Sequence, residues 1–265
     1  MLKDITLGQY FPGDSIIHRL DPRTKLIGVV IYIVALFMAK SWLSYAAVFA
    51  AAVILMGVSR ISARNIFKGL RPMLIIISMT AVLNVFYTQG TPVRPGWIIT
   101  WEGIDRAFKM ILRIILLITG TFLLTYTTSP LALTDGLEKL MSPLKKLKVP
   151  VHEMTMMMSM ALRFIPTLTE ETDKIMSAQK ARGADFETGS LIRRAKALVP
   201  ILVPLFVSAF RRADDLAVAM ESRCYHGGEG RTRMKQLIMT GEDYAALIVS
   251  LLFLAGVIAL RNFGG

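Results

Sequence analysis

The feature that most limits how this chain can fold is a set of apolar runs long enough to cross a lipid bilayer. A membrane-spanning helix needs about 20 predominantly apolar residues. Only 19% of the 265 residues are charged, and the mean hydropathy of +0.52 is too high for a soluble domain. We therefore predict an all-α membrane protein with about five transmembrane helices. The runs are residues 26–39, 43–59, 73–88, 110–128 and 244–260.

The basic residues between these runs predict which loops face the cytoplasm. Only Lys40 separates the first run from the second, whereas four cations separate the second from the third: Arg60, Arg64, Lys68 and Arg71. Because cytoplasmic loops carry an excess of Lys and Arg, the N-terminus is expected inside the cell and, after five crossings, the C-terminus outside. We predict a multi-pass protein of the cell membrane. Its domains are residues 1–128 with four spans, the cytoplasmic residues 129–243, and the last span in residues 244–265.

Arg113 is the one charged residue well inside a predicted span. It either snorkels outward from about one turn inside the interface, or faces the bundle interior or a subunit contact. The sequence leaves both interpretations open.

The predicted cytoplasmic segment has the apolar period of helices. Ser129 and Pro130 form a good start for a short amphipathic helix that runs to Met141. Apolar residues then recur at i, i+3 and i+4 from about residue 152 to 182, and again from about 190 to 223. We predict about three amphipathic helices here, two of them long. At about 1.5 Å per residue each long helix measures roughly 45 Å, so its apolar stripe needs a surface to pack against.

Methionines are concentrated in the first of these long helices, with five in the seven residues 154–160. Scattered methionines usually fill a core, but a cluster this dense covers more than one side of a helix. Methionine side chains are unbranched and polarizable, so a surface rich in them can repack against different partners. Core filling remains open, but we favour a docking surface. Its residues are Met154, Met157, Met158, Ala161, Leu162 and Ile165.

Each long helix is expected to end at a single arginine between small residues. The two motifs are Ala181-Arg182-Gly183 and Ser222-Arg223-Cys224. A cation near a helix C-terminus complements the helix dipole, and glycine is the usual left-handed cap, so a helix stop explains either motif alone. Two such ends, 41 residues apart, favour a binding role. Small neighbours allow close approach, and a guanidinium offers five donors to carboxylates or carbonyls.

Three segments resemble one family, the transmembrane T component (EcfT, of the CbiQ/EcfT type) of energy-coupling factor (ECF) transporters. They are HRLDPRTKL (18–26), ALRFIPTLTEETDKIMSAQKARG (161–183) and AMESRCY (219–225), and the resemblance covers essentially the whole chain. In that family the first arginine motif is Ala-Arg-Gly and the second varies around its arginine. Ser222 and Cys224 therefore have less certain roles than the arginine between them.

The resemblance implies that Arg182 and Arg223 each dock in a groove of one cytoplasmic ABC ATPase subunit, of the EcfA and EcfA′ types. It also implies that the long helices cross as coupling helices and carry ATPase motion to a substrate-binding S component, for uptake of a vitamin or another micronutrient. The S component would dock on the methionine-rich surface. It would also select the substrate, so this chain does not specify which vitamin or ion is transported, nor whether the module is shared.

Motifs for catalysis are missing from the sequence. No GxxxxGK[ST] occurs, HEMTM (152–156) departs from HExxH, and no serine lies in GxSxG. We expect a non-catalytic subunit without cofactor or metal, whose partner subunits bind ATP. Acidic residues interspersed among the basic ones argue against nucleic acid as a partner. The alternative is a self-sufficient carrier or membrane enzyme with a polar site formed by Arg113, Glu170, Glu171 and Asp173.

Overall fold

The computed structural model describes residues 10–92, 99–186, 188, 190–227 and 236–261. Within these residues all regular structure is helical apart from one isolated bridge between Pro92 and Thr100, which confirms the predicted all-α class. The described residues divide into two compact units. The membrane unit lies within Gly8–Gly136 and Leu237–Gly265, and the long-helix unit within Leu137–Gln236.

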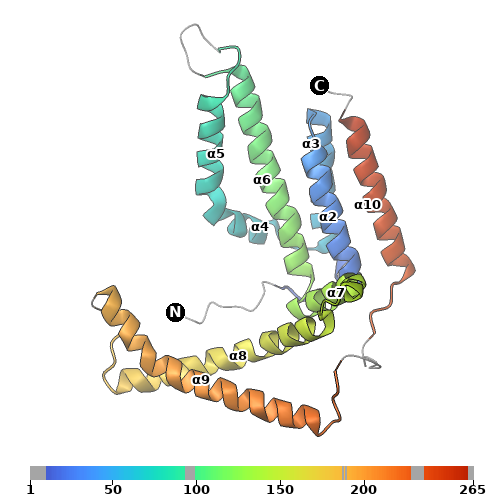
Figure 1. Ribbon diagram of the computed structural model, residues 1–265. Coiled ribbons are helices and arrows are strands. Elements are labelled where there is room, and N and C mark those ends of the chain that lie inside the picture. Colours follow the sequence, from blue (N-terminus) through green and yellow to red (C-terminus); the bar gives the residue numbers. More distant parts are fainter. Residues whose placement is uncertain (1–9, 93–98, 187, 189, 228–235, 262–265) are drawn as a thin grey trace. The chain divides into compact units, whose positions relative to one another are not determined.

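The membrane unit contains the apolar helices (Figure 1). They are α1 (Ile16–Arg19), α2 (Pro22–Met38), α3 (Trp42–Ser59), α4 (Ala63–Leu70), the 3₁₀ helix η1 (Arg71–Met73), α5 (Leu74–Tyr87), α6 (Trp101–Thr127) and α10 (Gly241–Leu260). Helix α7 (Pro130–Met141) begins in this unit and matches the predicted short amphipathic helix; the Ser129 hydroxyl accepts a bond from the Ala132 amide, 3.3 Å away. The long-helix unit follows with η2 (Ser142–Leu147), α8 (Val151–Ala181) and α9 (Leu191–Glu221).

Four stretches of the described chain are long and apolar enough to cross a membrane. They are Trp42–Ser59, Ala63–Tyr87, Trp101–Thr127 and Gly241–Leu260, and they contain four of the five predicted spans. The remaining predicted span lies in α2, which has only 17 residues and is not among the four.

Helix α2 nevertheless runs parallel to α10 along its length. At one end the backbone amide of Asp21 donates to Oδ1 of Asp243 at 2.8 Å, so the two helices begin side by side. At the other end Oγ of Ser41 donates to the carbonyl of Leu260 at 2.9 Å. The helices also pack against each other between these two bonds. Helix α2 therefore extends over the same distance along the bundle as the predicted span in α10.

The core of the membrane unit lies where α2, α3, α6 and α10 meet. Gly120 of α6 allows a close approach, because a Cβ atom there would lie only 2.4 Å from the ring of Tyr32 on α2. The hydroxyl of Tyr32 in turn donates to the Leu116 carbonyl at 3.0 Å. The buried hydrophobic residues of this core are Tyr32, Ala35, Leu36, Ala39, Tyr45, Val48, Ala52, Leu116 and Val257.

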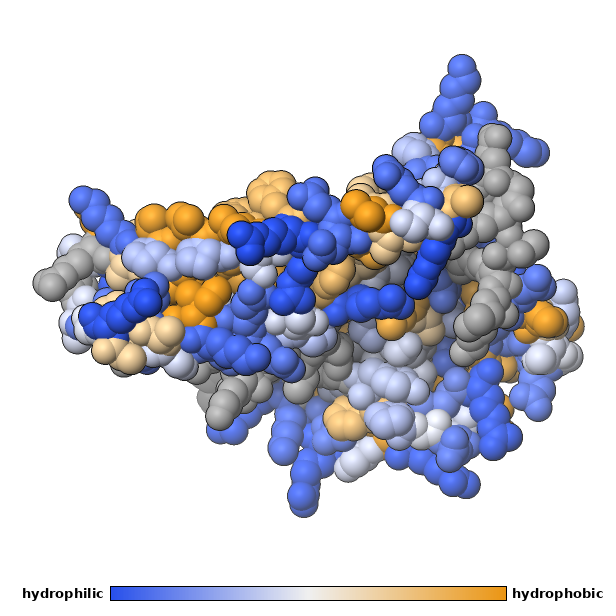
Figure 2. Space-filling view, turned by 90° about the horizontal axis from the view of Figure 1, so that it is seen from below, coloured by the Kyte–Doolittle hydropathy of each residue, from blue (hydrophilic) through white to orange (hydrophobic). Residues whose placement is uncertain are grey.

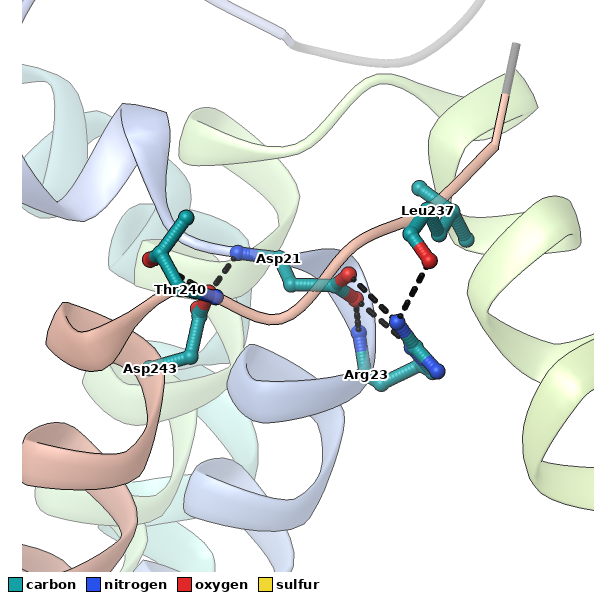
Figure 3. Close-up of polar contacts among 5 residues, drawn as sticks. All are labelled: Asp21, Arg23, Leu237, Thr240 and Asp243. Atoms are coloured by element: carbon teal, nitrogen blue, oxygen red, sulfur yellow. Dashed lines mark hydrogen bonds and ion pairs between the residues drawn. The ribbon is translucent and has the colours of Figure 1, made fainter.

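A buried polar cluster, which we call the polar joint, fixes the start of α10 against the start of α2 (Figure 3). The carboxylate of Asp243 is almost fully buried. Its Oδ2 accepts bonds from the amide and hydroxyl of Thr240, both at 2.8 Å, and its Oδ1 accepts the Asp21 amide. Asp21 caps α2, and its carboxylate accepts bonds from Nε and Nη2 of Arg23 at 3.0 and 2.9 Å. Arg23 Nη2 also donates to the Leu237 carbonyl at 3.1 Å.

The two carboxylates of the polar joint suit the helix ends that they occupy. Burial alone would raise the pKa of Asp21, but the hydrogen bonds and charge of Arg23 outweigh it and hold that pKa below its ordinary value. Asp21 therefore stays ionised at neutral pH. Negative charge at a helix N-terminus compensates the positive end of the helix dipole, and here two parallel helices each have such a carboxylate.

We expect the substitution Asp243→Asn to destabilise the membrane unit by about 2 kcal/mol, because an amide can no longer accept all three bonds as a charged group does. For a chain of this size this corresponds to a fall of roughly 4–8 °C in the midpoint of thermal unfolding. The measurement is thermal unfolding of the purified protein in detergent. The matched control is Glu242→Gln, which removes an exposed carboxylate one residue earlier. Equal midpoints for the two variants would contradict the role given to Asp243.

Candidate functional site

The two long helices of the sequence prediction are α8 and α9. The expected bounds of about 152–182 and 190–223 agree within two residues with Val151–Ala181 and Leu191–Glu221. Each helix has 31 residues, about 46 Å in length. Both are continuous through their prolines, which are Pro166 in α8 and Pro200 and Pro204 in α9.

Helices α8 and α9 cross each other and run in opposite directions (Figure 1). An ion pair joins them, with Nη2 of Arg212 on α9 lying 2.7 Å from Oε2 of Glu171 on α8. Hydrogen bonding from the Ser208 hydroxyl, together with the charge of Arg212, holds the pKa of Glu171 below its ordinary value. Glu171 is thus ionised at neutral pH, and the pair marks one point of contact between the crossed helices.

The ion pair lies at the same sequence distance from both arginine motifs. Glu171 precedes Arg182 by 11 residues, and Arg212 precedes Arg223 by the same number. At about 1.5 Å per residue, each arginine is roughly 16 Å along its helix from the pair. Because the helices run in opposite directions, the two arginines lie at opposite ends of the crossed pair (Figure 1).

The two helix ends have the same backbone geometry. In α8, Gly183 adopts φ +85°, and the amide of Ala184 donates to the Gln179 carbonyl at 3.0 Å. In α9, Cys224 adopts φ +55°, and the amide of Tyr225 donates to the Met220 carbonyl at 3.1 Å. Both closures are those of the Schellman motif, with a left-handed residue directly after the arginine. Cys224 thus takes the position that glycine takes in the first motif.

The side chains of both arginine motifs are exposed in the long-helix unit. Within the described residues, neither the guanidinium of Arg182 nor that of Arg223 forms a hydrogen bond or an ion pair. The structure therefore places the six residues at two separate helix ends and does not bring them together into one site. The exposed residues are Ala181, Arg182, Gly183, Ser222, Arg223 and Cys224.

The predicted methionine-rich surface is largely exposed on α8. Met154, Met157 and Met158 are among the exposed large hydrophobic residues, together with Ile165. Ala161 is exposed as well, and Leu162 is half-buried. Core filling within the described chain does not account for these side chains.

A second exposed apolar surface on α9 was not recognised in the sequence. Val199, Val203, Phe206 and Phe210 recur at intervals of four, three and four residues and are all exposed, Phe210 by 68%. The i, i+4 spacing was visible in the sequence, but apolar residues also recur on a neighbouring face, where Ile201 is buried and Leu198 and Leu202 are exposed. Figure 2 shows apolar side chains exposed beside hydrophilic ones over the crossed helices.

Arg113 turns toward its neighbouring helices. Its guanidinium donates to the Ala39 carbonyl at the end of α2, 3.4 Å away, and lies 5.7 Å from the ring centroids of both Phe37 and Tyr45. Of the two interpretations of this residue, the structure favours the one that faces the bundle interior. Arg113 stabilises a helix C-terminus there.

The residues of the alternative polar site belong to the two different units, and Arg113 and Glu171 have their partners within their own units. Arg113 has its partners on α2 and α3, whereas Glu171 is paired with Arg212 on α9. The membrane unit has a cavity of about 440 Å³ between α2, α3, α6 and α10, but its walls are mainly apolar. Among the described residues, no three His, Cys, Asp or Glu side chains gather closely enough to hold a metal ion.

Comparisons with known proteins agree on one family. The CbiQ family, which is described as "Cobalt transport protein", matches residues 13–234 of this chain. A protein of Thermosediminibacter oceani, named energy-coupling factor transporter transmembrane protein EcfT, is 56% identical over 98% of this chain and 99% of its own length. Proteins of the same name from Clostridium kluyveri and Bacillus subtilis are 54% and 48% identical. They cover 100% and 97% of this chain, and 100% and 98% of their own lengths.

The two left-handed positions predict opposite effects of a pair of substitutions. A left-handed residue other than glycine costs about 1 kcal/mol, so Cys224→Gly should stabilise the last turn of α9 and Gly183→Ala should destabilise that of α8. No heavy atom lies within 4 Å of a Cβ placed at Gly183, so the effect there is purely one of the backbone. Amide hydrogen exchange across residues 179–184 and 220–225 should change by roughly fivefold in opposite directions. Exchange that changes in the same direction in both variants would contradict the shared geometry.

Proposed function

Because this chain belongs to the EcfT family of transmembrane proteins of energy-coupling factor transporters, we propose that it couples two cytoplasmic ATPase subunits to a substrate-binding S component for uptake of a micronutrient. In this proposal the chain is a non-catalytic subunit and ATP binds to its partners. The observation that carries the proposal is the pair of helix ends with equivalent geometry, each presenting one exposed guanidinium.

Each arginine motif is suited to a groove on one ATPase subunit. The guanidinium can form paired hydrogen bonds with carboxylates or carbonyls, and the small side chains of Ala181, Gly183 and Ser222 allow the partner to approach the backbone. Since the two ends lie at opposite ends of the crossed helices, one subunit can bind each end without competition.

Movement of the ATPase subunits would reach the rest of the complex through the crossed helices. When the subunits move relative to each other, they displace Arg182 and Arg223, and the Glu171–Arg212 ion pair keeps α8 and α9 in contact between them. The helices then change their tilt together, which is a rigid-body transition of packed elements.

The exposed apolar surfaces of α8 and α9 are suited to an S component. Methionines on α8 adapt to partners of different shape, and the α9 surface adds aromatic residues, which are enriched in interfaces. The S component would choose the vitamin or ion. The surface is defined by Met154, Met157, Met158, Ala161, Leu162, Ile165, Val199, Val203, Phe206 and Phe210.

We also propose five membrane crossings, with the N-terminus and the long helices in the cytoplasm and the C-terminus outside. The parallel packing of α2 against α10 supports this count. If α10 crosses the membrane, the two ends of α2 lie beside the two ends of α10 and therefore near the same two membrane surfaces. Snorkelling of Lys40 can compensate for the short length of α2.

Replacing Arg182 or Arg223 by alanine should remove a charge-assisted contact and weaken binding of an ATPase subunit by about 2–5 kcal/mol. Co-purification of the tagged chain with the ATPase subunits, and substrate uptake by cells, are the two measurements. The double variant should lose both more completely than either single variant. The matched control is Arg211→Ala, an exposed arginine in the middle of α9, which should leave both unchanged. Normal assembly and uptake in the double variant would refute the docking role.

The five-crossing arrangement predicts which cysteines are accessible from outside the cell. Cys224 is the only cysteine and is exposed, so in intact cells a membrane-impermeant maleimide should label it only after permeabilisation. In a Cys224→Ser background, Lys40→Cys and Arg261→Cys should both be labelled from outside. Labelling of one of these two positions but not the other in intact cells would contradict the parallel crossing of α2 and α10.

A further inference from the structure

Four cations follow the end of α3 at intervals of four, four and three residues. They are Arg60, Arg64, Lys68 and Arg71; helical spacing places the last three on one side of α4 and its end, and Arg60 precedes this helix as the left-handed C-cap of α3. All four are exposed, and among the described residues none of them has an ion-pair partner. No acidic residue occurs anywhere between Asp21 and Glu102. Within the part of the chain that the structure describes, no carboxylate therefore pairs with this cationic stripe.

The opposite side of α4 is fixed against α6. Ile66 and Leu70 are 4% and 6% exposed and form a buried cluster with Tyr126. The hydroxyl of Tyr126 donates to the Asn65 carbonyl at 3.4 Å. Gly69 allows close contact, because a Cβ atom there would lie 2.3 Å from the ring of Phe122. Helix α4 thus has one defined orientation, with its cationic stripe turned away from the protein.

Helix α4 is set off from α5, although both belong to the apolar stretch Ala63–Tyr87. It follows α3 and is separated from α5 by η1, which contains Pro72 and turns the chain. Figure 1 shows α4 lying across the direction of α5 and α6. Beside the cations, Phe67 exposes 72% of its surface. A short helix with a protruding aromatic residue and several cations is typical of a segment at the boundary of headgroups and acyl chains.

We propose that the cationic stripe of α4 binds the headgroup of an anionic phospholipid, with Phe67 inserted between the acyl chains beneath it. Charge complementarity favours this occupant, because the leaflet beside the stripe carries phosphate groups and the four exposed cations have no ion-pair partner among the described residues. Basic residues directly beside a membrane span attract anionic lipids in this way. The bound lipid would fix the depth of the α3–α5 hairpin at the cytoplasmic surface. This inference does not depend on the ATPase or S-component partners.

The test is the association of spin-labelled lipids with the full chain reconstituted in phosphatidylcholine vesicles. The motionally restricted fraction of spin-labelled phosphatidylglycerol, relative to that of spin-labelled phosphatidylcholine, measures selectivity for the anionic headgroup. The test variant replaces all four cations by glutamine: Arg60→Gln, Arg64→Gln, Lys68→Gln and Arg71→Gln. The control variant removes the same number of exposed charges elsewhere: Lys139→Gln, Lys145→Gln, Lys146→Gln and Lys148→Gln.

We expect the α4 variant to lose roughly two- to fivefold in selectivity, and the control variant to keep the wild-type value. High salt should reduce the wild-type selectivity toward that of the α4 variant. If the fourfold variant does not fold, the paired changes at 60 and 64 and at 68 and 71 should each remove part of the effect. Unchanged selectivity in the α4 variants, or an equal loss in the control, would overturn the proposal. Unchanged selectivity together with lost co-purification of an ATPase subunit would indicate an acidic protein partner and would overturn it as well.

Discussion

The membrane unit depends on how the buried charge of Asp243 is satisfied. A carboxylate that is 1% exposed is tolerated only when hydrogen-bond donors replace the water it has lost. Two of its donors come from Thr240, directly before α10, and the third is the amide of Asp21, directly before α2. Satisfying the charge therefore brings the starts of α2 and α10 to the same level, and the bond from Ser41 to Leu260 aligns their other ends. The contact of Arg23 with Leu237 then holds the segment that leads into α10 at this level.

The long-helix unit repeats one plan twice. Each helix has a residue of the ion pair, an arginine near its end and a left-handed residue after that arginine. Each of these residues in α9 follows its counterpart in α8 by 41 positions, as Arg212 follows Glu171 and Cys224 follows Gly183. A force applied at either helix end therefore acts at the same distance from the shared ion pair. Such symmetry suits a part that must respond equally to two partners, and it arises here without any repeat of the intervening sequence.

Much of this arrangement could be predicted from the sequence because it depends on local pattern. The helical period and the Arg-Gly stop located the ends of α8 within one or two residues, and apolar runs located four spans. What the sequence did not reveal depends on contacts between distant segments. The pairing of Asp21 with Asp243 joins residues 222 positions apart, and only packing decides that Arg113 faces the end of α2. On α9, apolar residues occupy two neighbouring faces, so period alone could not tell the buried Ile201 from the exposed Phe206.

The parallel pairing of α2 with α10 also affects the order in which the protein can form during synthesis. Adjacent parallel elements cannot be joined by a tight turn, so everything from α3 to α9 serves as the connection between them. Val257, a fully buried core residue, lies in α10, which is synthesised after all of these elements. Until then the flank of α2 has no protein neighbour from α10, and contacts of such high sequence separation form slowly. A nascent chain must therefore already have completed α8 and α9 before its membrane bundle can close.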